Sequence, residues 1–338
     1  MSGGNNQRGH GVETMTTVTG GTLRRRRGWA LVVLGALALL AGCEAPLDLE
    51  RVEAELARPV HRFDQFKALA RNDDVVMAVG DYGVVVTSSD EGRSWQRKVL
   101  PGRPALVSVS ACPDGGFAAL DTRRGVWLAG PDGGGFERRE VETREVVTSV
   151  SCVPGGSLWL TASFSTLVVS RDGGETWEET TQDEDLQFSV LQFFDADNGV
   201  VVGEFGGFMS TADGGATWER GADIPNEFYP LGMYFRDRDT GWVSGLGGII
   251  LATTDGGETW SEQQTDASVP LYRVVPVNGH LYAMGDSGTL LVLDGERWVR
   301  APNAPELLSY LIDAVRLDEG RFLVAGGGGM LKDVPYGR

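Results

Sequence analysis

Short apolar runs alternate with polar, glycine-rich turns along most of the chain after residue 67. One stretch reads VLQFF, NGVVVGEF, GFMSTAD and TWERG, and the next reads LGMYF, TGWVSGL, GIILATTD and TWSEQ. Valine, isoleucine, phenylalanine and tryptophan dominate these runs, and Asp-Gly, Asn-Gly and Gly-Gly pairs separate them, as in β-hairpins. Because this region has no long helical period, the pattern predicts short antiparallel strands.

An eight-residue motif recurs within this pattern. Its clearest copies are SSDEGRSW (88–95), SRDGGETW (170–177), TADGGATW (211–218) and TTDGGETW (253–260), with weaker versions at 130–136 and 292–298. The shared aspartates are 39 to 42 residues apart, and a tight, mostly glycine-rich turn upstream of them recurs seven times at the same period. Seven units of four short strands predict an all-β fold, a seven-bladed β-propeller with Asp-box turns.

The motif has a structural interpretation. An Asp between the third and fourth strands can accept hydrogen bonds from its own turn, the glycines adopt conformations closed to other residues, and the Trp packs between sheets. We assign this role to Asp90, Gly92, Trp95, Asp172, Gly174, Trp177, Asp213, Gly215, Trp218, Asp255, Gly257 and Trp260. A calcium loop is disfavoured, because it would need several oxygen ligands within about a dozen residues.

The last unit lacks a Trp-led fourth strand, since only VPYGR follows MLKD. An unpaired strand edge is a liability. We therefore expect residues 58–66, RPVHRFDQF, to supply the missing strand and close the ring. The alternative is that 58–66 is a linker and that the last blade has three strands.

The order of apolar strand, G-x-x-G turn, apolar strand and T-x-D-G-G-x-T-W resembles the Asp-box repeats of sialidases and sortilins. It is more similar to the photosystem II stability/assembly factor family, and residues 198–218 and 240–260 carry this resemblance best. The resemblance extends over residues 65–335. It implies a seven-bladed propeller that helps to assemble or stabilise a membrane protein complex, and no binding residue is transferred from the family.

Residues 1–42 have the features of a lipoprotein signal peptide. A basic LRRRR precedes an apolar run from Trp29 to Ala41, which is short for a membrane span but normal for a signal peptide. The small residues before Cys43 resemble the bacterial lipoprotein signal, in which the cysteine is lipidated and becomes the new N-terminus. Met15 offers an alternative start, which would make residues 1–14 an over-long beginning.

The expected lipid on Cys43 would attach the chain to a membrane. Glu44 follows, rather than the Asp of the usual inner-membrane retention signal, so we expect the periplasmic side of the outer membrane. Residues 43–57 would form the tether, with a short helix carrying Leu49, Val52 and Leu56, and residues 58–338 the propeller.

The chain is strongly acidic, with 30 basic and 47 acidic residues. Without the first 43 residues, which contain five arginines and one glutamate, 25 basic and 46 acidic residues remain, a net charge of −21. Such a surface repels nucleic acid and anionic headgroups. It is either a solvated shell or a docking surface for a basic partner, and QDEDLQ (182–187) is its densest acidic stretch.

Cys112 and Cys152 each lie 13 residues before the turn of their unit, where other units have mostly apolar residues. We expect two buried packing residues in adjacent blades, because equivalent inner strands tend to be too far apart for a disulfide. An exported protein does permit the bond. Isolated histidines and the absence of a metal-ligand spacing predict no metal site and no cofactor.

The sequence favours a binding scaffold over an enzyme. It lacks the Arg-Ile-Pro signature of sialidases, although a carboxylate pair for glycoside hydrolysis remains an alternative among so many acids. A propeller usually binds partners on the face opposite its Asp-boxes. Aromatic and arginine side chains there are typical of binding hot spots, and the candidates for contacts with an envelope protein or membrane protein complex are Tyr82, Arg123, Arg124, Phe164, Phe205, Phe228, Tyr229, Tyr272 and Tyr310. The alternative function is a polysaccharide-binding or glycoside-hydrolysing propeller.

Overall fold

The structure is a computed structural model that describes residues 49–302, 304–317 and 320–335. The chain divides into two compact units, Met1–Glu55 and Leu56–Arg338. Helix α2 (Glu50–Leu56) lies where a short helix was predicted. The predicted signal peptide and Cys43 lie outside the described residues, and none of the described helices is long and apolar enough to cross a membrane.

The second unit consists of antiparallel sheets whose strands pair in sequence order. The first three sheets contain β1 (Phe66–Arg71), β2 (Val76–Gly80), β3 (Val84–Ser88) and β4 (Gln96–Val99); β5 (Leu106–Ala111), β6 (Phe117–Asp121), β7 (Gly125–Ala129) and β8 (Glu137–Glu140); and β9 (Val147–Cys152), β10 (Leu158–Ala162), β11 (Thr166–Ser170) and β12 (Glu178–Thr181).

The remaining sheets continue this order. They contain β13 (Phe188–Phe193), β14 (Gly199–Gly203), β15 (Phe208–Thr211) and β16 (Glu219–Arg220); β17 (Pro230–Phe235), β18 (Gly241–Gly245), β19 (Ile250–Thr253) and β20 (Ser261–Thr265); β21 (Leu271–Val277), β22 (His280–Gly285), β23 (Leu290–Asp294) and β24 (Arg297–Arg300); and β25 (Leu311–Arg316), β26 (Arg321–Gly326) and β27 (Leu331–Pro335). A parallel pairing of β20 with β24 joins two of these groups into one eight-stranded sheet.

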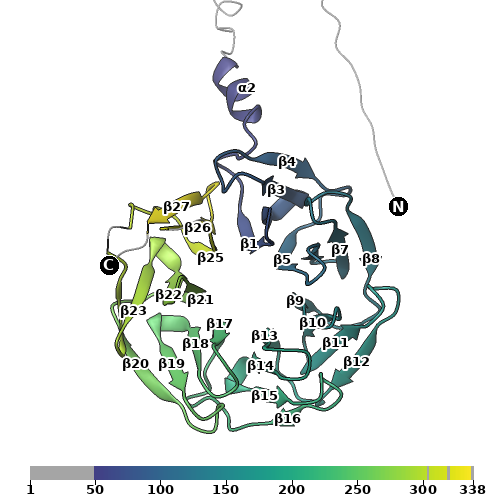
Figure 1. The fold of residues 1–338 in the computed structure, drawn as a ribbon, viewed down its shortest axis with the longest axis vertical. Helices are drawn as coiled ribbons and strands as arrows, with labels where there is room; N and C mark the ends of the chain where they lie inside the picture. The colour runs from purple at the N-terminus through teal and green to yellow at the C-terminus, as the bar shows by residue number, and fades with distance from the viewer. Residues whose placement is uncertain (1–48, 303, 318–319, 336–338) are drawn as a thin grey trace, which may run out of the picture. The chain divides into compact units, whose positions relative to one another are not determined.

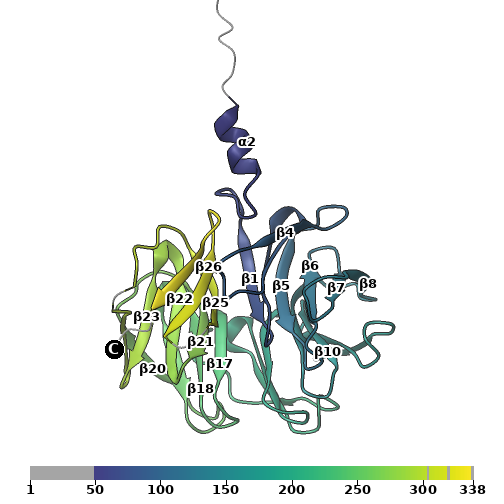
Figure 2. The same ribbon diagram turned by 45° about the horizontal axis from the view of Figure 1, so that its top comes forward.

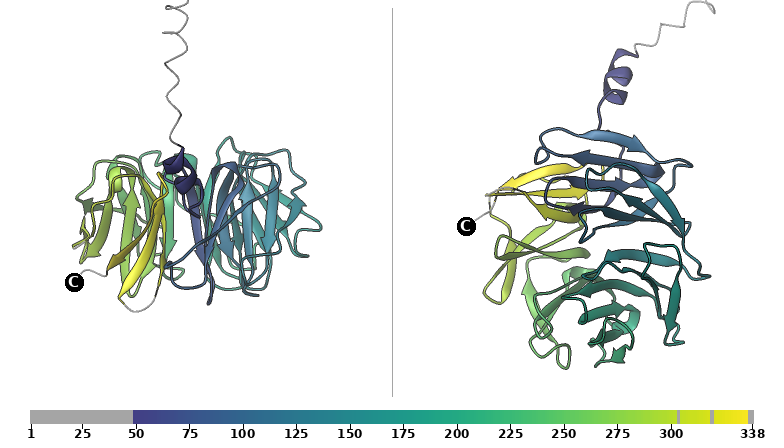
Figure 3. Two further views of the ribbon diagram at one scale, coloured as in Figure 1. Left: turned by 90° about the horizontal axis from the view of Figure 1, so that it is seen from above. Right: turned by 45° about the vertical axis from the view of Figure 1, so that its right-hand side comes forward.

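The sheets are arranged around a common axis, with the first strand of each sheet innermost (Figure 1). Their strands run between the two faces of this ring (Figure 2, Figure 3). The described residues thus form an all-β fold of mostly four-stranded antiparallel sheets, which is consistent with the predicted β-propeller.

The hydrophobic core lies between neighbouring sheets. Each core cluster combines buried residues of two consecutive groups of strands, and one of them joins β1–β3 to β25–β26. In that cluster Phe66 and Val86 share a core with Leu323 and Ala325, so burial of apolar surface closes the ring.

The predicted closing strand is wrong, and the three-stranded alternative is right for the described residues. Residues 58–64 contain no strand, and only Gln65 forms an isolated bridge with Gly327. The reason is a tight turn in which the backbone nitrogen of His61 donates to the carboxylate of Asp64 (2.7 Å). Both carboxylate oxygens of Asp64 also accept hydrogen bonds from Arg97 of β4 (2.8 and 2.9 Å), which fixes this segment to the first sheet instead.

The expectation of unpaired cysteines is also wrong. Cys112 and Cys152 form a disulfide between adjacent sheets, with their Cα atoms 4.9 Å apart. The prediction assumed that equivalent positions on inner strands lie too far apart. Residues at the ends of β5 and β9 nevertheless come within the range that a disulfide requires.

Candidate functional site

Each clear Asp-box motif forms the turn between the third and fourth strands of its sheet. In the β19–β20 turn the carboxylate of Asp255 accepts hydrogen bonds from the backbone nitrogen of Thr259 (2.9 Å) and from the hydroxyl of Thr253 (2.7 Å). The same contacts recur at Asp90, Asp172 and Asp213. The hydroxyl of the residue four positions after each Asp, such as Thr259 after Asp255, also donates to the carboxylate. This hydroxyl makes the largest contribution to lowering the pKa of all four carboxyls from 3.8 to about 2.

The motif glycines and tryptophans pack around these turns. Gly92, Gly174, Gly215 and Gly257 all have a positive φ. A Cβ atom at Gly215 would lie 2.3 Å from the ring of Trp159, so only glycine fits there. The indole of Trp218 packs edge-on against Trp159 at 5.7 Å, and that of Trp260 against Phe208 at 5.7 Å. Trp95 and Trp177 are partly buried against the core clusters of their sheets.

A hollow of about 770 Å³ lies beside two of these motifs, and Asp213, Asp255 and Glu219 line it. Glycoside hydrolysis needs one carboxyl whose pKa is raised, so that it can protonate the leaving group. Hydrogen bonds hold the pKa of Asp213 and Asp255 at about 2, which is the opposite direction. Those two carboxylates are therefore unsuited to act as the acid.

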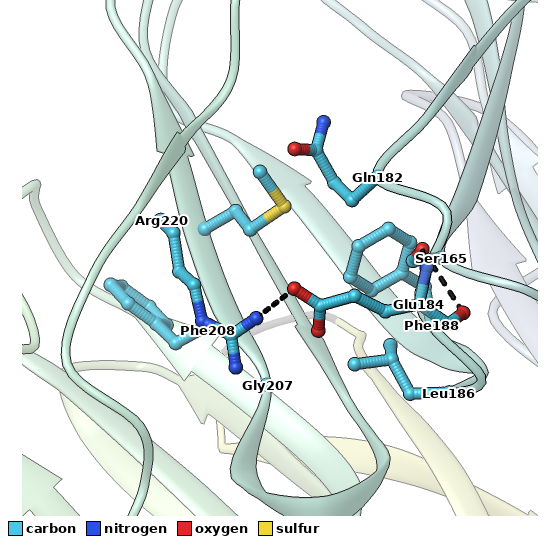
Figure 4. A pocket seen from close by; sticks show the side chains of 9 residues that line it. Ser165, Gln182, Glu184, Leu186, Phe188, Gly207, Phe208 and Arg220 are labelled. Carbon is cyan, nitrogen blue, oxygen red and sulfur yellow. Dashed lines mark hydrogen bonds and ion pairs between the residues drawn. The ribbon is translucent and has the colours of Figure 1, made fainter.

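A second cavity lies between the sheets of β9–β12 and β13–β16 (Figure 4). Its volume of about 20 Å³ is enough for a water molecule but not for a sugar. Arg220 and Glu184 form an ion pair beside it, and the hydroxyl of Ser165 donates to the backbone oxygen of Glu184 (3.2 Å). This cavity is a packing defect between sheets rather than a ligand site.

The face of the ring opposite the Asp-box turns carries the turns between second and third strands and the segments that link one sheet to the next. We call it the connection face. Backbone hydrogen bonds tie the turns to the links. The backbone nitrogens of Gly83, Ser165, Gly206, Asp286 and Gly327 donate to the oxygens of Pro104, Leu186, Phe228, Pro270 and Tyr310. The structure thus brings together on one face the segments from which all the predicted contact residues come.

The predicted contact residues differ in exposure. Tyr82, Phe164 and Phe205 project into solvent, with 75%, 55% and 56% of their surface exposed, and Arg123 and Tyr229 are also exposed. Arg124, Tyr272 and Tyr310 are half-buried, and Arg124 donates to the backbone oxygen of Thr143. Phe228 is a correction, because it is only 6% exposed and packs into the core beside Ile224.

Sequence reasoning missed several exposed residues of the same face. They are Phe63, Val146, Leu246, Leu308, Arg103 and Arg144. In the sequence each of them is an isolated apolar or basic residue in a turn or a linking segment. Such a residue does not by itself indicate whether its side chain is exposed. Within residues 57–335, the described large hydrophobic residues that are exposed all lie on the connection face or at a strand end leading to it.

The tips of three turns have an unusual backbone. Tyr82, Phe164 and Phe205 have φ values of 58°, 52° and 57°, a conformation that bulky residues seldom adopt. Arg124 occupies this position in the turn 121–125 with a φ of 61°, and two further turns of the ring have Gly247 and Ser287 there. The aromatic side chains therefore do not stabilise their turns, and their exposure leaves them available for contacts with another molecule.

Among the described residues no cluster of three or more His, Cys, Asp or Glu could hold a metal ion. The connection face combines exposed aromatic and arginine side chains, residue types that are enriched in binding hot spots.

The sequence model of the family described as photosynthesis system II assembly factor YCF48 matches residues 131–221 and 183–275. Photosystem II assembly protein Ycf48 of Thermosynechococcus vestitus is 31% identical over 161 residues, which are 45% of this chain and 46% of that protein. The chain thus matches about half the length of this curated relative.

Solved structures show the same fold. A structure of YCF48 bound to a D1 peptide superposes with a TM-score of 0.66 at 16% identity, covering 82% of this chain and 95% of the other. Virginiamycin B lyase of Staphylococcus aureus, an enzyme, gives a TM-score of 0.69 at 11% identity over 80% of this chain and 94% of the lyase. Fold alone therefore does not separate scaffold from enzyme.

Proposed function

We propose that this chain, which resembles the photosystem II assembly factor family, is a non-enzymatic scaffold that helps to assemble or stabilise a membrane protein complex of the cell envelope. The sequence similarity of its central part supports the assembly role. A relative has been solved with a peptide of the D1 protein, so a segment of a membrane protein is the kind of partner that we propose.

The ring of this scaffold has seven blades in our proposal. The eight-stranded sheet counts as two blades, because a short parallel pairing joins two complete four-stranded antiparallel groups. The last blade has three described strands. The sequence period of 39 to 42 residues supports the same count.

We also propose that the chain is exported and lipidated on Cys43, and that it resides on the periplasmic side of the outer membrane. The proposal rests on the basic start, the apolar run and the small residues before Cys43. The disulfide between Cys112 and Cys152 supports export, since such bonds persist in oxidising compartments.

The observation that carries the scaffold function is the one-sided distribution of exposed aromatic residues. Phe164 and Phe205 project from the connection face, whereas the Asp-box turns bury or bind their own polar groups. Exposed aromatic residues that do not stabilise their own turns are typical of binding hot spots.

The test is an affinity pull-down of the lipidated protein from its own membranes, with mass spectrometry of the proteins that come with it. We expect a stoichiometric membrane protein complex, and Phe205→Ser together with Leu246→Ser should remove it. Glu258→Ser on the Asp-box face is the matched control and should retain it. If the complex still binds the connection-face variant, the scaffold surface is wrongly placed; if nothing binds the unmodified protein, the scaffold function fails.

A further inference from the structure

The connection face is not uniform in charge. The turn that carries Tyr82 lies between the links 58–65 and 100–105, since the nitrogen of Asp81 donates to the oxygen of Gln65 and that of Gly83 to Pro104. The next turn, 121–125, contacts the links 100–105 and 141–146 in the same way. These segments therefore form one continuous sector of the face.

This sector is basic and apolar. It exposes Phe63, Tyr82, Arg103, Arg123, Arg144 and Val146, which we call the basic–aromatic sector. The side chains of Arg103, Arg123 and Arg144 form no ion pair with any described residue. Among the carboxylates of these turns and links only Glu142 is exposed. Asp64 and Asp121 are buried, and Asp81 pairs with Lys67. Glu145 is half-buried and accepts a hydrogen bond from the hydroxyl of Ser163.

The neighbouring part of the face has the opposite charge. Phe205 occupies the same turn position as Tyr82 and has nearly the same φ, 57° against 58°. Its turn, however, lies between the links 182–187 and 221–229, which expose Asp183, Asp185, Asp223 and Glu227.

We infer that the basic–aromatic sector rests on a bilayer surface that contains anionic phospholipids. Aromatic and aliphatic side chains on protruding turns enter the headgroup region, while guanidinium groups bind phosphates. This inference rests on the proposed lipid anchor and deepens it, because the lipid would keep the chain at a bilayer, while the basic–aromatic sector would decide which part of the connection face rests on it.

The path of the chain supports this occupant over a soluble protein. Residues 58–65 enter the ring on the connection face beside Tyr82, where Asp64 and Gln65 hydrogen-bond to two turns. Arg58 follows Cys43 by fifteen positions in the sequence, a reach of at most about 54 Å. A lipid on Cys43 would therefore keep this sector within that distance of the membrane.

The net negative charge of the chain does not oppose the contact. At physiological ionic strength charges are screened over about 8 Å, so the membrane responds to the sector nearest to it and not to the acidic residues across the ring. The sequence-based expectation that the whole surface repels anionic headgroups stays a prediction for the acidic residues around Phe205, and our inference departs from it at the basic–aromatic sector.

The test uses a fluorescent reporter of membrane insertion on the lipidated full chain. Cys112 and Cys152 are bonded to each other, so a cysteine introduced by Tyr82→Cys can be labelled with the environment-sensitive dye NBD. Phe205→Cys is the matched control on the acidic part of the connection face, and Glu258→Cys reports on the Asp-box face. Vesicles contain phosphatidylcholine alone or with phosphatidylglycerol.

We expect the label at position 82 to shift to the blue and brighten several-fold only on vesicles with phosphatidylglycerol, and high salt should reverse the change. Labels at 205 and 258 should remain in water. Arg123→Glu should abolish the shift at 82, whereas Arg238→Glu, a charge reversal at an exposed position on the Asp-box face, should leave it unchanged.

Three outcomes would overturn the inference. The first is that the label at 82 stays in water on anionic vesicles, and the second is that all three labels shift equally. The third, measured in addition with native membranes, is that the label at 82 shifts there but not on vesicles, which would assign the sector to a protein partner. The anchor is tested separately by the mass of the N-terminal peptide. If Cys43 carries no lipid, that part of the proposed function fails, while added vesicles still test the sector.

Discussion

Asp313 and Arg273 form an ion pair between neighbouring inner strands, with 3.3 Å between Oδ1 of the aspartate and Nε of the arginine. The other carboxylate oxygen of Asp313 accepts a hydrogen bond from the backbone nitrogen of Leu69 (3.3 Å). One side chain thus links β21, β25 and β1. This network joins the first and last sheets of the ring through their inner strands, where no closing strand from 58–64 links them.

Replacing Asp313 tests this closure. The residue is only 5% exposed, and Asp313→Ala would leave the buried backbone nitrogen of Ala314 without its acceptor, as well as that of Leu69. We expect a loss of about 1–3 kcal/mol in the free energy of unfolding, measured in urea. An unchanged urea midpoint would show that the hydrophobic cluster between the first and last sheets closes the ring by itself.

Asp313→Asn tests the electrostatic part of the same network. Burial raises the pKa of Asp313 above 3.8, and the nearby Arg273 only partly offsets this. A raised folded-state pKa favours folding below 3.8, and this contribution is lost as pH rises through the folded pKa. The variant has no titrating group there. Its free energy of unfolding relative to the unmodified protein should therefore improve as pH rises, and a difference independent of pH would contradict the raised pKa.

The Asp-boxes predict the opposite pH dependence. The pKa of Asp255 is about 2, with the hydroxyl of Thr259 as the largest cause. A lowered folded-state pKa stabilises the protein above 3.8, and this contribution disappears as pH falls toward 2. Thr259→Ala should move the pKa of Asp255 toward 3.8 in a carboxyl NMR titration. Thr254→Ala, an exposed neighbour in the same turn, is the control and should leave the titration where it is.

Whether the sequence predicted the structure at a residue depended on how many residues separate it from the partner that determines its position. The Asp-box was predictable because Thr253, Asp255 and Thr259 interact across two to four residues. Phe228 and Tyr229 are adjacent and both aromatic, yet one is buried and the other exposed. Their difference depends on packing against another sheet, which no local pattern encodes.

The same limit applies to the closing segment and to the charge of the connection face. The turn at Asp64 is held by Arg97, 33 residues away, so composition alone could not replace the expected strand by a loop. Net charge likewise concealed the basic–aromatic sector, because Arg103, Arg123 and Arg144 come together only when two links and one turn assemble on one face.

The disulfide should contribute to stability across two sheets. Cys112 and Cys152 are 40 residues apart. Closing a loop of that length lowers the conformational entropy of the unfolded chain, which raises its free energy by about 3–4 kcal/mol at room temperature. Cys112→Ser with Cys152→Ser should lower the free energy of unfolding by that amount. Reducing agent should lower the urea midpoint of the unmodified protein and leave that of the variant unchanged. Equal responses of the two proteins would show that the bond does not form in solution.

Gly215 offers a test of how tightly the Asp-box turns pack against the next sheet. Its φ is 80°, and a Cβ atom there would lie 2.3 Å from the ring of Trp159, so Gly215→Ala adds overpacking to backbone strain. Gly173 is the matched control, because its φ is 74° but nothing lies within 4 Å of the added atom. Backbone strain costs about 1–2 kcal/mol in both variants. Overpacking adds about 1–3 kcal/mol only at Gly215. Equal losses in the two variants, measured by urea unfolding, would mean that the indole of Trp159 moves aside and that this interface between sheets is loosely packed.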